Sequence, residues 1–182
     1  MTRIRSHAFV FALSLAALAG CGKQRIEEAV DKNDRGAVKQ ALEAGADVNA
    51  RTSTGDTPLL LAVKSGQSSS AQALIEGGAD LKALDDSGNS VLHLAARSGM
   101  TGICGMLIDR GIAVDARGEG GATPVQLAIQ AGKQETAKYL VRRGASIDQK
   151  NDAGVSALDL GARGGDPQFT NDLKAAAASR SQ

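Results

Sequence analysis

His93 and Cys104 are the side chains beyond residue 21 whose types could support nucleophilic catalysis. A cysteine thiol becomes a nucleophile when a neighbouring imidazole takes its proton. The two residues stand eleven positions apart, and that part of the chain has no other histidine or cysteine. None of the 20 acidic residues lies in a recognisable catalytic or metal-ligand motif. We therefore predict no catalytic residue, no metal site and no cofactor, and an enzyme is the remote alternative.

A glycine-rich run, Gly118-Glu119-Gly120-Gly121, could cradle a phosphate group with its backbone N–H groups. Phosphate loops of this kind carry a lysine and connect a strand to a helix, and this run has neither feature. We predict a hairpin tip here instead.

The N-terminal segment carries a different signal. Ala8 to Gly20 is an uncharged run of thirteen residues, whereas a helix that spans a bilayer needs about 20. Arg3 and Arg5 precede the run, and small residues end it, which is the layout of a secretory signal peptide. We expect residues 1–20 to be a signal peptide that is removed, followed by a tether over 21–23.

Leu18-Ala19-Gly20-Cys21 resembles the bacterial lipobox, in which a lipid is attached to the cysteine and cleavage occurs just before it. The resemblance implies that Cys21 is lipidated and that the mature chain is anchored on the periplasmic side of a membrane. Two or more acyl chains give a durable anchor. Gly22 and Lys23 lack the aspartate that resembles an inner-membrane retention signal, which favours the outer membrane. The alternatives are an ordinary signal peptide with a coincidental cysteine and a buried terminal helix.

Composition excludes one class of partner. Two of the 21 Lys and Arg residues precede Cys21, so 19 face 20 acidic residues and the mature balance is −1. Beyond residue 21 the aromatic residues are Tyr139 and Phe169, too few for a base-stacking platform. We expect no nucleic acid partner, since a phosphate backbone needs a positive field. The 42% hydrophobic content can supply one core, which must be aliphatic because the chain has no tryptophan.

The chain repeats itself every 33 residues without insertion. A glycine in a polar loop keeps the period, as does a glycine that ends each unit. The openings are Thr57-Pro58-Leu59-Leu60-Leu61-Ala62, Ser90-Val91-Leu92-His93-Leu94-Ala95, Thr123-Pro124-Val125-Gln126-Leu127-Ala128 and Ser156-Ala157-Leu158-Asp159-Leu160-Gly161. The loop glycines are Gly55, Gly88, Gly121 and Gly154, and the closing ones are Gly45, Gly78, Gly111 and Gly144.

Each marker has a mechanical reason. A Thr, Ser or Asp caps a helix start, and proline at the next position loses nothing because its missing N–H would be unpaired there. Pro58, Pro124 and Pro167 all stand at such positions. The short inner helix should end at a glycine in the left-handed conformation, and a second helix should follow. The predicted helix-ending glycines are Gly66, Gly99, Gly132 and Gly165.

This helix–turn–helix–loop unit, with Thr-Pro-Leu-Leu-Leu-Ala and Gly-Ala-Asp-Val-Asn-Ala in place, resembles the ankyrin repeat. The resemblance implies an all-α solenoid of about five units with short hairpin-like turns, covering residues 24–175. Terminal units need a polar outer face, which Asp172 and Lys174 should supply at the C-terminal end. We predict an N-terminal cap unit over 24–50, units over 51–83, 84–116 and 117–149, a C-terminal cap unit over 150–175, and a tail over 176–182.

The resemblance also gives His93 and Cys104 structural roles. His93 occupies a position where ankyrin repeats commonly have a histidine bonded to neighbouring backbone. Cys104 aligns with Val38, Ala71 and Ala137, a small apolar set on the second helix, which favours a buried thiol. The alternative is an odd cysteine that pairs with a partner.

Stacked repeats give an extended concave surface suited to another protein. We therefore expect a monomeric protein-interaction module that supports or localises an envelope protein, and the alternative is an inhibitor or immunity protein that blocks a toxin. Lys64, Arg97 and Arg163 should align as a basic row, interrupted at Gln130. Such charges at solvated helix ends often serve solubility alone, and the alternative is an acidic partner. The exposed positions predicted to bind the partner are Arg51, Asp56, Lys64, Leu84, Asp86, Asn89, Arg97, Arg117, Glu119, Gln130, Lys150, Asp152 and Arg163.

Overall fold

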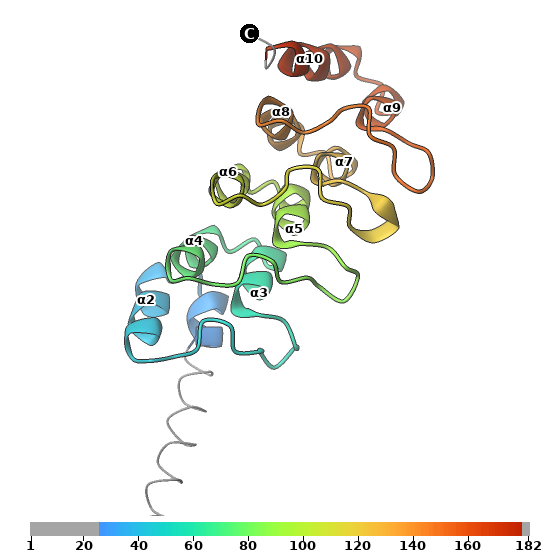
Figure 1. Ribbon diagram of the computed structural model, residues 1–182. Helices are drawn as coiled ribbons and strands as arrows, with labels where there is room; N and C mark the ends of the chain where they lie inside the picture. Colours follow the sequence, from blue (N-terminus) through green and yellow to red (C-terminus); the bar gives the residue numbers. More distant parts are fainter. Residues whose placement is uncertain (1–25, 180–182) are drawn as a thin grey trace, which may run out of the picture.

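The computed structural model describes residues 26–179, which form a stack of helical pairs (Figure 1). The helices are 26–31, α2 (Arg35–Glu43), α3 (Pro58–Lys64), α4 (Ser68–Glu76), α5 (Val91–Ser98), α6 (Thr101–Asp109), α7 (Pro124–Gln130), α8 (Gln134–Arg142), α9 (Ala157–Arg163) and α10 (Pro167–Ala178). In the described part, an isolated bridge between Leu84 and Ser90 is the only extended pairing. The predicted all-α solenoid is confirmed.

Two columns of helices and one row of loops make up the stack. Figure 1 shows α2, α4, α6, α8 and α10 in one column and α3, α5, α7 and α9 in the other, with the loops projecting beyond the second column. We call the second column the inner helices and the first the outer helices. The loops are called finger A (51–56), finger B (84–89), finger C (117–122) and finger D (150–155).

Capping residues start the helices where the sequence predicts. Thr57 Oγ1 accepts a hydrogen bond from the N–H of Leu60 at 3.3 Å, and Pro58 is the first residue of α3. At α10, Asp166 accepts from the N–H of Phe169 at 3.1 Å, and Pro167 follows. All three prolines open a helix, because each stands where no N–H is needed.

Left-handed glycines end the inner helices. Gly66, Gly99, Gly132 and Gly165 have φ of 71°, 76°, 69° and 72°. A residue with a Cβ adopts this conformation at a cost, so glycine lets the chain reverse within two residues and begin the outer helix.

The same backbone hydrogen bond closes every finger. The N–H groups of Thr52, Asp85, Gly118 and Asn151 donate to the carbonyls four residues later, at 2.8 to 3.0 Å. The predicted hairpin tip at Gly118–Gly121 is a turn of 3-10 helix over Glu119–Gly121, in which Gly120 and Gly121 have positive φ.

Equivalent leucines stack along the middle of the array. Leu74, Leu107, Leu140 and Leu173 lie on successive outer helices at the 33-residue period, and none has measurable exposure. Alanines and valines of the inner helices fill the space beside them, and Phe169 is the one buried aromatic side chain among the described residues. The core is therefore aliphatic as predicted.

The C-terminal unit differs from the prediction in one respect. Asp172 was expected on the outer face of the array, but its carboxylate lies 3.5 Å from Lys138 Nζ on α8 and faces the preceding unit. Lys174 is exposed. The reason is charge pairing, since Lys138 on the neighbouring helix stands within reach of this carboxylate. The segment 176–178 continues α10, whose last residue is Ala178.

Candidate functional site

A groove of about 410 Å³ lies between the inner helices and the fingers. One wall is formed by Arg97, near the end of α5, together with Leu127 and Gln130 of α7. Finger C and finger D form the other wall, with Glu119, Gly120, Asn151, Asp152 and Ala153. Asn89 and Ala122 lie at the base, between the helix wall and the finger wall. This volume is in the range of pockets that bind ligands or peptide side chains.

The groove brings together some of the predicted binding residues and leaves out others. Asn89, Arg97, Glu119, Gln130 and Asp152 line it. Those outside its lining are Arg51, Asp56, Lys64, Leu84, Asp86, Arg117, Lys150 and Arg163. The lining residues that sequence reasoning missed are Gly120, Ala122, Leu127, Asn151 and Ala153. Leu127 belongs to the repeat opening and not to the turn and helix-end positions that were selected. Gly120, Asn151 and Ala153 adjoin predicted finger residues and could have been found by that neighbourhood.

Two of the residues predicted to be exposed are buried. Asp56 is 9% exposed and Asn89 is 1% exposed. Asp56 accepts from Lys64 Nζ with both carboxylate oxygens, at 2.7 and 2.9 Å. The expectation of an open turn residue is wrong at both positions. Asp56 turns back and pairs within its own unit, whereas Asn89 Oδ1 bonds to finger C of the next unit.

The predicted basic row is shortened by the same contact. Lys64 is neutralised by Asp56, and its side chain is 31% exposed. Arg97 and Arg163 are exposed, and in the part of the chain that the structure describes neither forms an ion pair. Gln130 interrupts the row as predicted. Arg97 is the member of the row that lines the groove.

Hydrogen bonds join fingers B, C and D into one unit. Asn89 Oδ1 accepts from the N–H of Glu119 at 3.1 Å, which ties finger C to finger B. Arg117 donates to the Asp152 carboxylate at 2.6 Å and to the Lys150 carbonyl at 3.0 Å, which ties finger D to finger C. The finger wall of the groove is thus fixed before any partner arrives, which lowers the entropic cost of binding.

Finger A is held differently. Its Ser53 N–H donates to Glu27 Oε1 at 2.7 Å, toward the N-terminal unit, and Arg51 donates to the Gly55 carbonyl within the finger. Between the described residues of fingers A and B there is no hydrogen bond. The groove lies over the tied fingers only.

His93 connects an inner helix to the next finger. Its Nδ1 accepts from the N–H of Ser90 at 3.2 Å, and its Nε2–H donates to the carbonyls of Ala116 at 3.0 Å and Ala122 at 3.1 Å. A backbone N–H only donates and a carbonyl only accepts, so these partners require the neutral tautomer with the proton on Nε2. Burial lowers the pKa of His93, which keeps it neutral. The predicted structural role is confirmed.

Gln126 performs the same task one unit later. Its Oε1 accepts from the N–H of Thr123 at 3.1 Å, and its amide donates to the carbonyls of Gln149 and Val155 at 2.7 and 3.2 Å. These carbonyls stand 33 residues after those bound by His93.

Cys104 is a buried thiol and not a nucleophile. It has no exposed surface, and burial raises its pKa to about 12. At neutral pH the sulfur therefore stays protonated, and the thiolate that nucleophilic attack requires is not formed.

We expect Cys104→Ala to lower the free energy of unfolding by about 1 kcal/mol and to leave partner binding unchanged. The side chain fills a small space in the α6 core and reaches no part of the groove. Urea denaturation and calorimetric titration measure the two quantities. Lost binding with normal stability would contradict the buried-core role.

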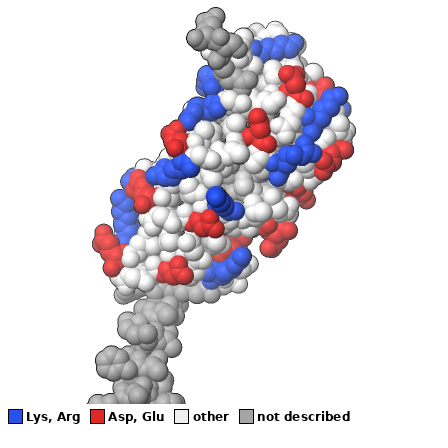
Figure 2. Space-filling model, viewed as in Figure 1, with Lys and Arg blue, Asp and Glu red and all other residues white. Residues whose placement is uncertain are grey.

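Exposed apolar surface is sparse. Leu84, in finger B, is 55% exposed and is the one large hydrophobic side chain that the described residues leave in solvent. Figure 2 shows Lys and Arg interspersed with Asp and Glu over the face it presents. Such a surface does not form the continuous positive field that a nucleic acid requires.

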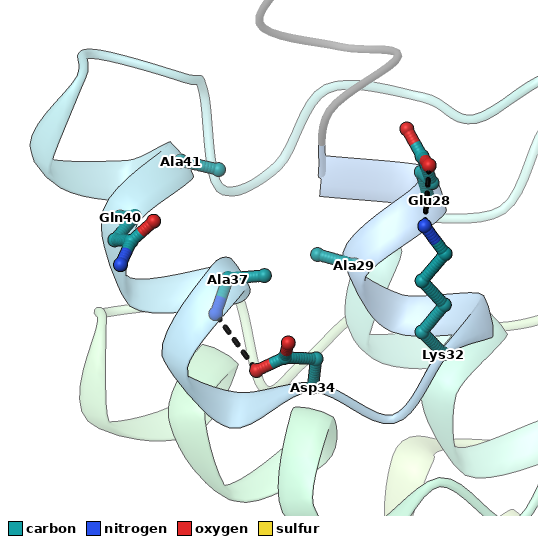
Figure 3. Close-up of a pocket in the computed structure, with 7 residues that line it drawn as sticks. All are labelled: Glu28, Ala29, Lys32, Asp34, Ala37, Gln40 and Ala41. Carbon is teal, nitrogen blue, oxygen red and sulfur yellow. Dashed lines mark hydrogen bonds and ion pairs between the residues drawn. The ribbon is translucent and has the colours of Figure 1, made fainter.

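Another hollow, of about 340 Å³, lies at the N-terminal end between helix 26–31 and α2 (Figure 3). Its charged side chains are already occupied. Lys32 Nζ lies 2.6 Å from Glu28, and Asp34 caps α2 by accepting from the N–H of Ala37. This hollow is the end face of the stack, and it offers a partner no free charge.

Residues 26–179 contain no group of three or more potential metal ligands. No helix in this range has the length and apolarity needed to cross a bilayer. Cys21 and the predicted signal peptide lie outside the described residues.

Comparison with protein families gives two matches. A model of ankyrin repeats in three copies matches residues 26–118, and a model of one ankyrin repeat matches residues 120–152. A search of curated proteins finds no match. The helices α9 and α10 lie beyond both family matches, yet they continue the same stack.

Ankyrin repeats are protein-interaction modules, and proteins built from them are generally non-enzymatic. The period, the capped inner helices, the fingers and the groove agree with this class. Since the first match alone covers more than half of the sequence, the chain belongs to the ankyrin-repeat family.

Proposed function

We propose that this chain is a lipid-anchored interaction module on the periplasmic face of a bacterial outer membrane, where it supports or localises an envelope protein. The observation that carries the binding role is the groove, because it combines a fixed finger wall with an exposed, unpaired Arg97 near the middle of the array. Arginine at a central, shielded position is a frequent source of binding energy.

The anchor rests on the sequence around Cys21. A basic start, a short apolar run and Leu18-Ala19-Gly20-Cys21 favour lipidation of that cysteine. A lipid on residue 21 would hold the first helical unit, which begins at Ile26, close to the bilayer. A partner in the groove would then also be held near the membrane.

Filling the groove should abolish capture of the partner. Ala153 is exposed at the tip of finger D and lines the groove, so Ala153→Trp occupies it without entering the core. We expect the wild-type chain to retain a protein from detergent-extracted envelopes and Ala153→Trp to retain at least about tenfold less of it. Quantitative mass spectrometry of the retained proteins makes the comparison.

The matched control is Ala175→Trp, which places the same bulk on the exposed side of α10. We expect this variant to behave as the wild type. A protein retained equally by both variants does not use the groove, and if every retained protein behaves so, the proposed site is wrong.

Cys21→Ala should release the chain from membranes or stall its processing, while the helical fold stays intact. The lipid and the repeat array use separate parts of the sequence, and the acyl chains supply the membrane affinity. Fractionation after a salt wash, with circular dichroism of the purified variant, tests both statements. A variant that still sediments with membranes would contradict the anchor.

A further inference from the structure

The groove holds two charges without partners. Arg97 and Glu119 line it, and neither side chain forms an ion pair with another described residue. The third charge in the lining, Asp152, is neutralised by Arg117 at 2.6 Å. The groove therefore presents one free cation and one free anion among the residues that the structure describes.

These two charges stand on opposite walls. Arg97 lies in the last turn of the inner helix α5, whereas Glu119 lies at the tip of finger C. They do not contact each other, although both line the same groove. The helix wall is thus positive and the finger wall is negative.

A segment that fills this groove must supply a counter-ion for each of the two charges. Covering a charge removes its water, and a covered charge without a counter-ion costs far more than a paired one. A neutral segment would leave both walls unpaired. A run of acidic residues would meet Glu119, and a run of basic residues would meet Arg97, so each would be repelled by one wall.

The backbone of such a segment has room to approach. At Gly120 a Cβ would meet no atom within 4 Å, so the space above finger C is open. The side chains of Ala122 and Ala153, which also line the groove, are short and leave room for a bound chain. An extended chain can lie in the groove with its side chains directed at the two walls.

In an extended chain, successive side chains point to opposite sides. Residues i and i+1 can therefore reach opposite walls, whereas residues i and i+2 reach the same wall. On the basis of the groove role proposed above, we propose that the partner supplies an extended segment in which an acidic and a basic residue are immediate neighbours, the acidic one paired with Arg97 and the basic one with Glu119.

Selection from a random peptide library tests this directly. The full-length chain in detergent micelles is the target, and peptides that also bind Ala153→Trp are removed. We expect the enriched peptides to contain adjacent acidic and basic residues well above their frequency in the unselected library. Moving the two charges apart by one alanine in a selected peptide should weaken its binding about tenfold.

Charge reversal on the chain gives the second readout. Arg97→Glu and Glu119→Lys should each weaken a selected peptide about tenfold, and the double variant should restore binding to within about threefold. Restoration is expected because the peptide can turn about its axis and present the two charges to the exchanged walls. Lys174→Glu and Glu43→Lys, exposed positions outside the groove, are the matched controls.

The inference is overturned if enriched peptides lack the adjacent pair, if no groove-dependent peptide is enriched, if either single reversal leaves affinity unchanged, or if the double variant does not recover. These results are separable from failure of the proposed function. Suppose that an envelope protein is no longer retained by Ala153→Trp but is still retained by Arg97→Glu and by Glu119→Lys. The groove would then be used for binding, and the proposed pairing of charges would be wrong.

Discussion

We expect His93→Ala to lower the free energy of unfolding by about 3 kcal/mol, because one side chain satisfies three backbone groups. The substitution leaves the Ser90 N–H without its acceptor and the carbonyls of Ala116 and Ala122 without their donor. His93 is almost fully buried, so water does not replace these partners without cost, and the removed ring leaves a cavity. Urea denaturation followed by circular dichroism measures the change.

His93→Gln is the informative companion variant. Gln126 already makes the equivalent bonds in the next unit, so a glutamine at position 93 can accept from Ser90 and donate to finger C. We expect it to lose less than about 1 kcal/mol. A glutamine variant as unstable as the alanine variant would show that the imidazole ring contributes through packing and not through its hydrogen bonds.

The pH dependence of stability separates the same two variants. Burial lowers the pKa of His93 below the ordinary value of 6.5, so the unfolded chain takes up a proton at a higher pH than the folded chain does. Stability contributed by the neutral imidazole is complete above pH 6.5 and falls as the pH decreases below it. His93→Gln has no such proton, so it should show a weaker decline between neutral and mildly acidic pH.

Much of this fold follows from the sequence because repetition makes each feature visible several times. Thr57 and Thr123, with a proline after each, predict the inner helix starts, and the glycines at the same period predict where those helices end. The burial of Cys104 follows from its alignment with small apolar residues. The role of His93 is less direct, since a histidine position alone does not reveal that the carbonyls of Ala116 and Ala122 are its two acceptors.

The site was harder to predict because side-chain pairing is not periodic. Lys64 and Arg97 occupy equivalent positions, yet Lys64 is neutralised because Asp56 stands where the next unit has Asn89. Asp172 similarly turns to Lys138 on the preceding unit. A single alignment of repeats shows which residues share a position, but the partner of each charge depends on which residue happens to stand on the neighbouring turn.

A leucine at the same position in different units should contribute differently to the cooperativity of unfolding. Leu107 on α6 and Leu173 on α10 are equivalent in the repeat, and both have no exposed surface. Truncation of either to alanine removes the same atoms and leaves a comparable cavity, which costs about 3 to 4 kcal/mol locally. The difference lies in their neighbours, since α6 packs between α4 and α8, whereas α10 packs on α8 alone among the outer helices.

In a solenoid each unit contacts only its neighbours, so stability is transmitted from unit to unit. Leu107→Ala weakens the middle of the array, and we expect the whole urea transition to move to lower concentration and to broaden as the two ends begin to unfold separately. Leu173→Ala weakens the end, and we expect an early, small loss of helical signal from α9 and α10 followed by a main transition near that of the wild type. Circular dichroism resolves the two patterns. Superimposable urea curves for the two variants would mean that the array unfolds as one unit. The stability of the groove over fingers B to D would then depend equally on every repeat, including the distant ones.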